Sequence, residues 1–369
     1  MARKGTLAKF DELKPSFRAA ADQVTIGIDL GDKYSHCCLL GADGVMFAEG
    51  RVRSTPEAME SHFKNLPPSR FAIEVGGHSR WVSQVLQNWG HEVIVANPRN
   101  LPMITSNIRK SDRVDAHLLA RLARVDPQLL SPVSHRDKEH YPAVAQLRAR
   151  DLLVRARTRL INAVRGISKA TGLRIPACSS PSFSEKAAPF ISDELKPSLA
   201  PLLDTIEHLS QQICSFDKEI SRLGRQQYPE TAQLRQVSGV GPVTALEFVL
   251  TIGNPKRFVK SRDVGPYLGL TPRRDQSGNT DQQLKISKAG NKHLRSLLVQ
   301  CAQYLLGRFS PDSNLKRWGL KLASRGGKNG KKRAITAVAR KLAVLLHHLW
   351  VTGDVYDPLH NAIVSCPSS

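Results

Sequence analysis

The stretch VTIGIDL, residues 24–30, decides the fold of the first third of the chain. Its apolar run, which ends at Asp29 and Gly31, is typical of a buried strand that stops at a turn. Two further strands are expected soon after it, at 35–40 and 45–53. Three strands so close together in the sequence predict a sheet in this part of the chain.

Helices join the pattern in the next seventy residues. Thr55 can cap a helix in which Pro56 takes the first position. Strands and helices then alternate: a strand at 71–75, a helix at 79–89, a strand at 92–96 and a helix at 111–125. This order of elements is that of a ribonuclease H-like fold. The first region is therefore expected to be an α/β domain.

Length and charge limit the class of protein. The chain has 369 residues, more than one hydrophobic core usually serves, so two or three domains are expected. Lys and Arg number 54 against 32 Asp and Glu, and the net charge of +22 favours a polyanionic partner such as nucleic acid. The six cysteines show no CxxC and no metal-ligand spacing, which fits a reducing cytoplasm. Neither a secretion signal nor a membrane span is expected, because the longest late apolar pattern contains Arg340 and Lys341.

The middle of the chain has the period of paired helices. The first seam consists of Leu153, Ala156, Leu160, Ala163, Ile167 and Ala170, and the second of Leu199, Leu202, Ile206, Leu209, Ile213, Phe216, Ile220 and Leu223. They predict a coiled coil, formed within one chain or between chains. Residues 146–174 carry eight basic side chains against the single Asp151, which predicts that the first helix presents a face of one sign to nucleic acid.

Beyond Arg235 we expect a mostly helical region with glycine-rich breaks. The segment Val237-Ser-Gly-Val-Gly-Pro-Val-Thr resembles the hairpin of a helix-hairpin-helix. In such a hairpin Gly239 and Gly241 would let backbone N–H groups approach a phosphate. A plain helix-loop-helix would have a similar sequence, so both interpretations stay open.

Four carboxylates are expected to converge in the α/β domain. Asp29 ends the first strand, Glu74 lies in the fourth, and Asp112 and Asp115 share one face at the start of a helix. Close carboxylates repel one another by ~4 kcal/mol per pair at an effective dielectric near ~20, so the cluster needs a counter-charge. A hard divalent cation such as magnesium supplies it. The alternative is that each acid is structural, as a turn residue, a strand polar group or a charge at a helix N-terminus.

These motifs resemble those of a known family. The matching segments are Gly27-Ile-Asp29, Ala72-Ile-Glu74, Lys110-Ser-Asp112-Arg-Val-Asp115-Ala, Ser238-Gly-Val-Gly-Pro, Tyr267-Leu-Gly-Leu-Thr-Pro and Gln276-Ser277-Gly278. In combination they resemble the DEDD-type insertion-sequence transposases of the IS-one-ten and IS-eleven-eleven group.

The resemblance implies a bacterial enzyme that acts on donor and target DNA as a dimer or tetramer, guided by a structured bridge RNA. It implies one or two Mg²⁺ ions held by Asp29, Glu74, Asp112 and Asp115. It also gives Ser277, which lies in a polar loop and would otherwise be taken as a turn residue, the role of a nucleophile that forms a phosphoserine link to DNA. A hydrolytic Holliday-junction resolvase is the closest alternative, followed by a kinase of the actin and hexokinase superfamily and a non-catalytic nucleic-acid-binding scaffold.

The expected organisation has five parts: an extension at 1–23, a RuvC-like domain at 24–145, a coiled coil at 146–230, a transposase domain at 231–355 and a tail at 356–369. Expected nucleic-acid contacts lie in the basic and glycine-rich segments: Arg148, Arg155, Arg159, Gly239, Gly241, Arg273, Arg274, Lys288, Lys292, Lys331, Lys332 and Arg333.

Overall fold

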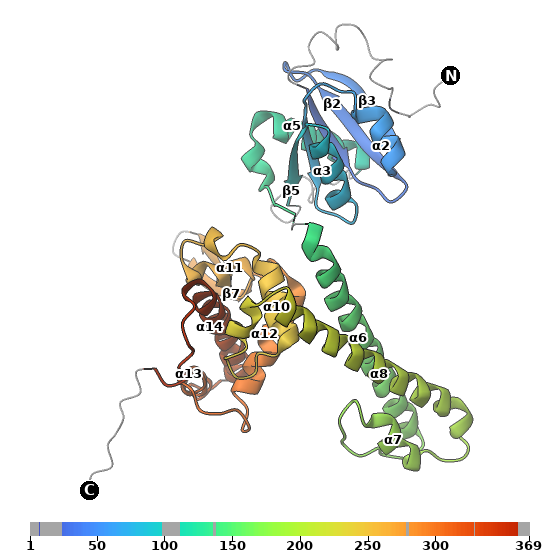
Figure 1. Ribbon diagram of the computed structural model, residues 1–369, viewed down its shortest axis with the longest axis vertical. Helices are drawn as coiled ribbons and strands as arrows, with labels where there is room; N and C mark the ends of the chain where they lie inside the picture. The colour runs from blue at the N-terminus through green and yellow to red at the C-terminus, as the bar shows by residue number, and fades with distance from the viewer. Residues whose placement is uncertain are drawn as a thin grey trace. The chain divides into compact units, whose positions relative to one another are not determined.

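The computed structural model describes Leu7 and residues 24–97, 111–135, 138–277, 280–327 and 329–360, and the statements below concern these residues (Figure 1). The chain divides into two compact units, Met1–His135 and Arg136–Ser369. We describe each unit by itself. The division into an extension, three domains and a tail stays a prediction.

The first unit is built on one five-stranded sheet with the order β3-β2-β1-β4-β5. Strand β1 pairs antiparallel with β2 and parallel with β4, and β5 is parallel to β4. The strands are β1 Thr25–Asp29, β2 Tyr34–Leu40, β3 Met46–Arg53, β4 Arg70–Glu74 and β5 Glu92–Ala96, and the helices are α2 Pro56–Phe63, α3 Ser79–Asn88 and α5 Asp112–Val125, followed by the 3-10 turn η4 Pro127–Leu130. Every strand and helix predicted for this unit is present.

Helices cover both faces of this sheet. On one face, Ile26 and Ile28 of β1 share a core with Met59 and Phe63 of α2 and with residues of α3. On the other face, Ala116 and Ala120 of α5 pack on the sheet. The alternation of side chains along β1 therefore separates two cores. Leu7, from the expected extension, is buried in the first core and its N–H donates to the Arg51 carbonyl.

Gly27 sets the distance between β1 and α5. A Cβ added at this position would lie 2.0 Å from the Ala116 carbonyl oxygen and 2.5 Å from the Ala120 nitrogen. Both are backbone atoms and cannot move aside without moving the helix. A glycine at position 27 is therefore a condition for α5 to lie where it does.

Two long helices dominate the start of the second unit (Figure 1). These are α6, Tyr141–Ala170, preceded by the turn η5 Lys138–His140, and α8, Lys196–Gln226. They pack against each other within the chain. Between them, α7 Phe183–Ala187 and the turn η6 Ala188–Phe190 form a small separate core with the helix pair.

The predicted seam is right for α8 and wrong for α6. In α8 the buried apolar residues include Ile206, Ile213 and Ile220. In α6 the predicted Ile167 is 41% exposed, and the buried residues are instead Ala143, Leu147, Ile161, Val164 and Ser168. Arginines occupy the seam, which is why an apolar pattern misplaces it: Arg150 pairs with Asp217 of α8 at 2.9 Å, and Arg157 donates to Ser210 at 3.1 Å.

The remainder of the second unit is a helical lobe with one hairpin. Its helices are α9 Glu230–Leu234, α10 Pro242–Ile252, α11 Val264–Tyr267, α12 Lys292–Leu305, α13 Asn314–Ala323 and α14 Gly330–Thr352, with 3-10 turns η7 Pro255–Arg257 and η8 Ser261–Asp263. Helix α14 is long and apolar enough to cross a membrane by length and composition, but its inner face, including Val338, Leu342 and Leu346, packs in the core of the lobe.

The hairpin corrects the expectation of a polar loop around Ser277. Strands β6 Pro272–Ser277 and β7 Thr280–Ile286 pair antiparallel and form a two-stranded sheet. Their sequences, PRRDQS and TDQQLKI, are mostly polar, and only Leu284, Lys285 and Ile286 show the alternation that marks a strand, over too few residues to be recognised. The pairing was therefore not recognisable from periodicity.

We expect Gly27→Ala to destabilise the first unit by several kcal/mol, because α5 must shift to admit the methyl group. Gly166→Ala is the matched control. Gly166 lies inside α6 with nothing within 4 Å of its added Cβ, so the substitution should stabilise the helix by about 0.5–1 kcal/mol. Urea unfolding followed by circular dichroism measures both. Equal stability of the two variants would contradict the close packing of α5.

Candidate functional site

Asp29 and Glu74 lie at the same edge of the first unit's sheet. Each is the last residue of its strand, and the parallel register pairs Ile28 with Ile73 directly before them. Gly27 and Ala72, two residues earlier, both face α5. Since side chains alternate along a strand, Asp29 and Glu74 are on the α5 face as well.

The N-terminus of α5 brings Asp112 and Asp115 to this edge. Ser111 caps the helix, and both acids lie in its first turn. The Asp112 carboxylate is 3.8 Å from Nε2 of His36, which is the ladder partner of Asp29 in β2. Asp115 is 4% exposed. The other end of α5 lies at the opposite edge, where Arg70 donates to the Ala123 carbonyl. All four predicted carboxylates therefore share one edge and one face.

This set of acids has the chemistry of a site for a hard divalent cation, because every donor atom is a carboxylate oxygen. In the described part of the chain, however, no three His, Cys, Asp or Glu side chains are arranged closely enough to hold a metal ion. The shared edge thus supplies suitable donors without a closed set of ligands. A helix N-terminus also stabilises acids by itself, so the structural interpretation of Asp112 and Asp115 is satisfied too.

Ser277 ends β6 in the hairpin of the second unit, and its side chain and Gly278 lie outside the described residues. Arg273 is exposed. Arg274 pairs with Asp281 across the hairpin, and this pairing raises the pKa of the guanidinium. The remaining predicted cations are exposed: Lys288, Lys292, Lys331, Lys332 and Arg333.

The glycines of the predicted helix-hairpin-helix lie between α9 and α10. Gly239 has φ +84°, and an added Cβ would lie 2.6 Å from the Tyr304 ring, so the turn depends on glycine. Gly241 is the N-cap of α10. A pocket of about 470 Å³ lies beside both, lined also by Cys301. Phosphate binding at this turn stays a prediction.

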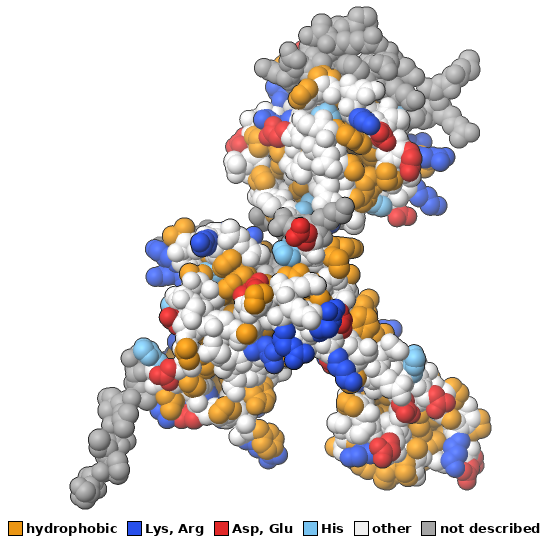
Figure 2. Space-filling view, viewed as in Figure 1, with side chains coloured by type: hydrophobic (Ala, Val, Ile, Leu, Met, Phe, Trp, Pro, Cys, Tyr) orange, Lys and Arg blue, Asp and Glu red, His pale blue; other side chains and the backbone are white. Residues whose placement is uncertain are grey.

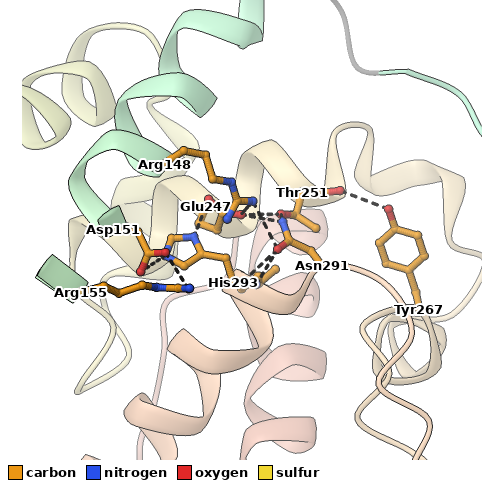
Figure 3. A network of polar contacts seen from close by, with 9 residues as sticks. Arg148, Asp151, Arg155, Glu247, Thr251, Tyr267, Asn291 and His293 are labelled. Carbon is orange, nitrogen blue, oxygen red and sulfur yellow. Dashed lines mark hydrogen bonds and ion pairs between the residues drawn. The ribbon is translucent and has the colours of Figure 1, made fainter. Parts of the chain in front are cut away.

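A buried polar network in the second unit was not predicted (Figure 3). We call it the Glu247 network, and it consists of Glu247 and Thr251 of α10, Asn291 and His293 at the start of α12, and Arg148, Asp151 and Arg155 of α6. At its centre the Glu247 carboxylate, 1% exposed, accepts from Arg148 at 3.0 Å and from Asn291 at 2.6 Å. Its residues come from three helices that are far apart in the sequence, so no local sequence pattern predicts the network.

His293 links the two carboxylates of this network. Its Nδ1 is 3.3 Å from Glu247 and its Nε2 is 3.5 Å from Asp151, which also pairs with Arg155 at 2.7 Å. Asn291 accepts from the backbone N–H groups of His293 and Leu294 and so caps α12 while it donates to Glu247. The network therefore fixes α6, α10 and α12 relative to one another.

The Glu247 network and the α6–α8 contacts correct the predicted one-signed face of α6. Of the eight basic residues at 146–174, five have partners within the chain: Arg148, Arg150, Arg155, Arg157 and Arg165. Arg159 is exposed. Binding of nucleic acid by Arg148, Arg155 and Arg159 stays a prediction, but the first two already hold internal carboxylates.

Burial and partners act in opposite directions on Glu247. Burial by itself raises the pKa of the carboxyl. The adjacent His293 ring, the charge of Arg148 and the hydrogen bond from Asn291 outweigh it and bring the pKa below its ordinary value. Glu247 is therefore a buried carboxylate held in its charged form.

Comparison with known proteins matches segments of both units to transposase family models. A family model for DEDD transposases of the IS110 type, described as "Transposase", matches residues 26–170, and one described as "Transposase IS116/IS110/IS902 family" matches residues 231–317. The chain is similar to the transposase for insertion sequence element IS1111A of Coxiella burnetii, 28% identical over 92% of this chain and 93% of that protein. It is similar to the transposase for insertion sequence element IS1328 of Yersinia enterocolitica, 28% identical over 90% and 98%. It also resembles the pilin gene-inverting protein of Moraxella bovis, 25% identical over 78% and 81%.

We expect Glu247→Ala to destabilise the second unit by about 3–5 kcal/mol, because Arg148 and His293 would lose a buried partner. Glu219→Ala is the matched control, since Glu219 pairs with Arg222 at the surface of α8 and its loss should change little. Because the pKa of Glu247 is lowered on folding, its stabilisation is present at neutral pH and is lost as the pH falls below the ordinary glutamate range. Urea unfolding at pH 7 and pH 4 tests both points. Equal losses in the two variants at pH 7 would contradict the assignment.

Proposed function

Because the chain belongs to the DEDD-type insertion-sequence transposases, we propose that it catalyses RNA-guided strand cleavage and exchange between donor and target DNA. We propose further that a carboxylate-held metal site and a serine nucleophile carry the chemistry. The observation that most supports this is the convergence of Asp29, Glu74, Asp112 and Asp115 at one edge of the sheet on the α5 face. All four side chains offer the carboxylate oxygens that a hard divalent cation prefers as ligands.

Divalent metal ions are generally used by this family, and we propose Mg²⁺ here. Asp29, Glu74, Asp112 and Asp115 would hold it, and when bound it would offset charge that develops on a phosphodiester. Asp115, nearly buried, would present a carboxylate fixed by the helix, whereas Asp112 is exposed and beside His36. The protein's part is to hold these oxygens at one edge before DNA arrives.

For the covalent step we propose Ser277. Its hydroxyl oxygen would form a bond to phosphorus while one bond from phosphorus to a sugar oxygen breaks, and the hydroxyl proton would leave to a base. The leaving strand end keeps a free hydroxyl, and a hydroxyl from the exchanged strand would later reverse the step. The position of Ser277 at the end of β6, in an exposed hairpin, suits the approach of a DNA backbone.

Charge supports nucleic acids as partners. The net charge is +22, and Lys and Arg side chains form patches on the visible face of the second unit (Figure 2). The first turn of α14 carries exposed Lys331, Lys332 and Arg333 and no acid. The partial positive charge of a helix N-terminus repels cationic side chains there, so a bound anion such as a phosphate would stabilise them. We propose that donor and target DNA, and a structured guide RNA encoded by the element, bind to such surfaces of a dimer or tetramer.

The hydrolytic resolvase is the main rival. It would use the same carboxylates with water as nucleophile and form no protein–DNA link. The name of the Moraxella bovis relative, a pilin gene-inverting protein, describes rearrangement of DNA. That name favours a recombinase that rejoins strands over an enzyme that only cuts them.

We expect Asp29→Asn, Glu74→Gln and Asp115→Asn each to lower strand cleavage at least ~100-fold while the fold and RNA binding are kept, because each removes a charge at nearly constant shape. Asp126→Asn is the control: Asp126 caps the turn after α5 at the far end of that helix, and asparagine can make the same bond to Gln128. Gel analysis of labelled DNA in Mg²⁺ measures cleavage. A site variant that cuts at the wild-type rate would remove that residue from the set of ligands.

We expect Ser277 to become covalently joined to DNA during strand exchange. A donor with an end label and a nick that traps the intermediate should give labelled protein after denaturation, and Ser277→Ala should abolish the label. Ser287→Ala, a serine just beyond β7, serves as the control and should keep the label. Mass spectrometry should locate the adduct in the peptide around Gln276-Ser277-Gly278. Cleaved DNA without an adduct would favour the hydrolytic rival.

A further inference from the structure

The loop between α10 and α11 presents the most exposed of the large hydrophobic side chains described. We call residues 255–263 the Val259 loop. Val259 is 92% exposed, although its neighbour Phe258 is partly buried against the core of the lobe. A single exposed valine needs no explanation by itself. Here, however, buried contacts anchor the loop so that Val259 faces solvent, and basic side chains lie on either side of it in the sequence.

The loop is fixed at its base by one buried histidine. His347 of α14, 1% exposed, lies 3.0 Å from the Ser261 hydroxyl through Nδ1 and 3.0 Å from the Pro255 carbonyl oxygen through Nε2. Phe258 stacks edge-on against His347 and Tyr267, with ring centroids 5.4 and 5.3 Å apart. The loop is therefore held at Pro255, Phe258 and Ser261, and Val259 lies between two of these anchored residues.

Cations flank Val259 on both sides. Lys256, Arg257, Lys260 and Arg262 are all exposed, and Asp263 is the one acid in the loop. None of the four forms a salt bridge with another described residue, whereas the exposed Arg274 and Arg317 each pair with an aspartate. The Arg257 guanidinium stacks over Tyr267 at 4.4 Å and over Phe258 at 4.8 Å, which orients it without neutralising it.

We propose that the Val259 loop binds duplex DNA, with its four cations on backbone phosphates and Val259 against thymine methyl groups in the major groove. The pattern of unpaired cations around an apolar tip matches the two chemistries that a groove offers, charged phosphates and apolar base edges. Duplex RNA does not match it as well. Its accessible groove displays 2′-hydroxyls, which valine cannot hydrogen-bond, and it lacks the thymine methyl.

This inference rests on the proposed function only in that DNA is the substrate. It requires neither the carboxylates nor Ser277 to act. Its failure can therefore be distinguished from failure of the catalytic proposals, because binding is measured with the full-length chain carrying Ser277→Ala and without Mg²⁺.

The test replaces thymine by uracil. Duplexes of alternating A·T and of alternating A·U in deoxyribose form differ only by the methyl group. We expect the protein to bind A·T DNA about 3- to 5-fold more tightly. Val259→Ser should remove that preference. Val355→Ser is the matched control, because Val355 is 85% exposed and lies after α14, outside the loop; it should keep the preference. Fluorescence anisotropy gives the affinities, and circular dichroism checks that both variants are folded.

The salt dependence tests the cations separately. Lys260→Ala should reduce the slope of log affinity against log salt concentration by about 1. Arg222→Ala, at a paired surface arginine of α8, should leave the slope unchanged. Three results would each overturn the proposal: equal binding of A·T and A·U duplexes by the wild-type chain, a preference that persists in Val259→Ser, or an equal loss of duplex RNA binding in that variant.

Discussion

The contact between Gly27 and the backbone of α5 is the constraint on which the positions of the four carboxylates of the first unit depend. Because β1 carries no side chain at this position, the helix approaches until Ala116 and Ala120 lie against the strand. That contact sets how far along the sheet the first turn of α5 reaches. Asp112 and Asp115 are in this turn, and Gly27 precedes Asp29 by two residues, so this contact sets how far the two helix acids lie from Asp29 and Glu74. Neither strand nor helix alone brings the four acids to one edge of the sheet. The packing between them does.

In the second unit, buried polar contacts rather than a close glycine–backbone contact hold helices in position relative to one another. The Glu247 network joins α6, α10 and α12 through one buried carboxylate and so fixes their relative positions. Buried ion pairs contribute less to stability than apolar packing of equal volume, but they are demanding about geometry. Asn291 shows the consequence: one amide caps α12 and donates to Glu247. The start of α12, which the network holds, follows soon after β7 of the hairpin that carries Ser277.

The sequence predicted what is local and missed what is not. Each strand and helix of the first unit follows from a run of apolar residues, a cap such as Ser111 or Thr55, or a turn, and these signals act within a few residues. The shared edge of the four carboxylates could be predicted because strand ends and helix starts are recognisable in the sequence; their role as metal ligands stays a prediction. The seam of α6 was misplaced because Arg150 and Arg157 occupy it, and their partners, Asp217 and Ser210, lie on another helix. The Glu247 network and the β6–β7 hairpin have no local signature either.

The internal partners of the α6 arginines limit what the net charge of +22 says about nucleic-acid binding. A count of cations treats every arginine as available to a polyanion, yet most of those on α6 are committed to carboxylates, carbonyls or hydroxyls within the chain. A phosphate would have to compete with partners that are already placed, one of them the buried Glu247. Cations that have no such partner bind a phosphate without that competition. The surfaces for nucleic acid are therefore better inferred from unpaired cations on a fixed backbone, as in the Val259 loop, than from the density of basic residues along the sequence.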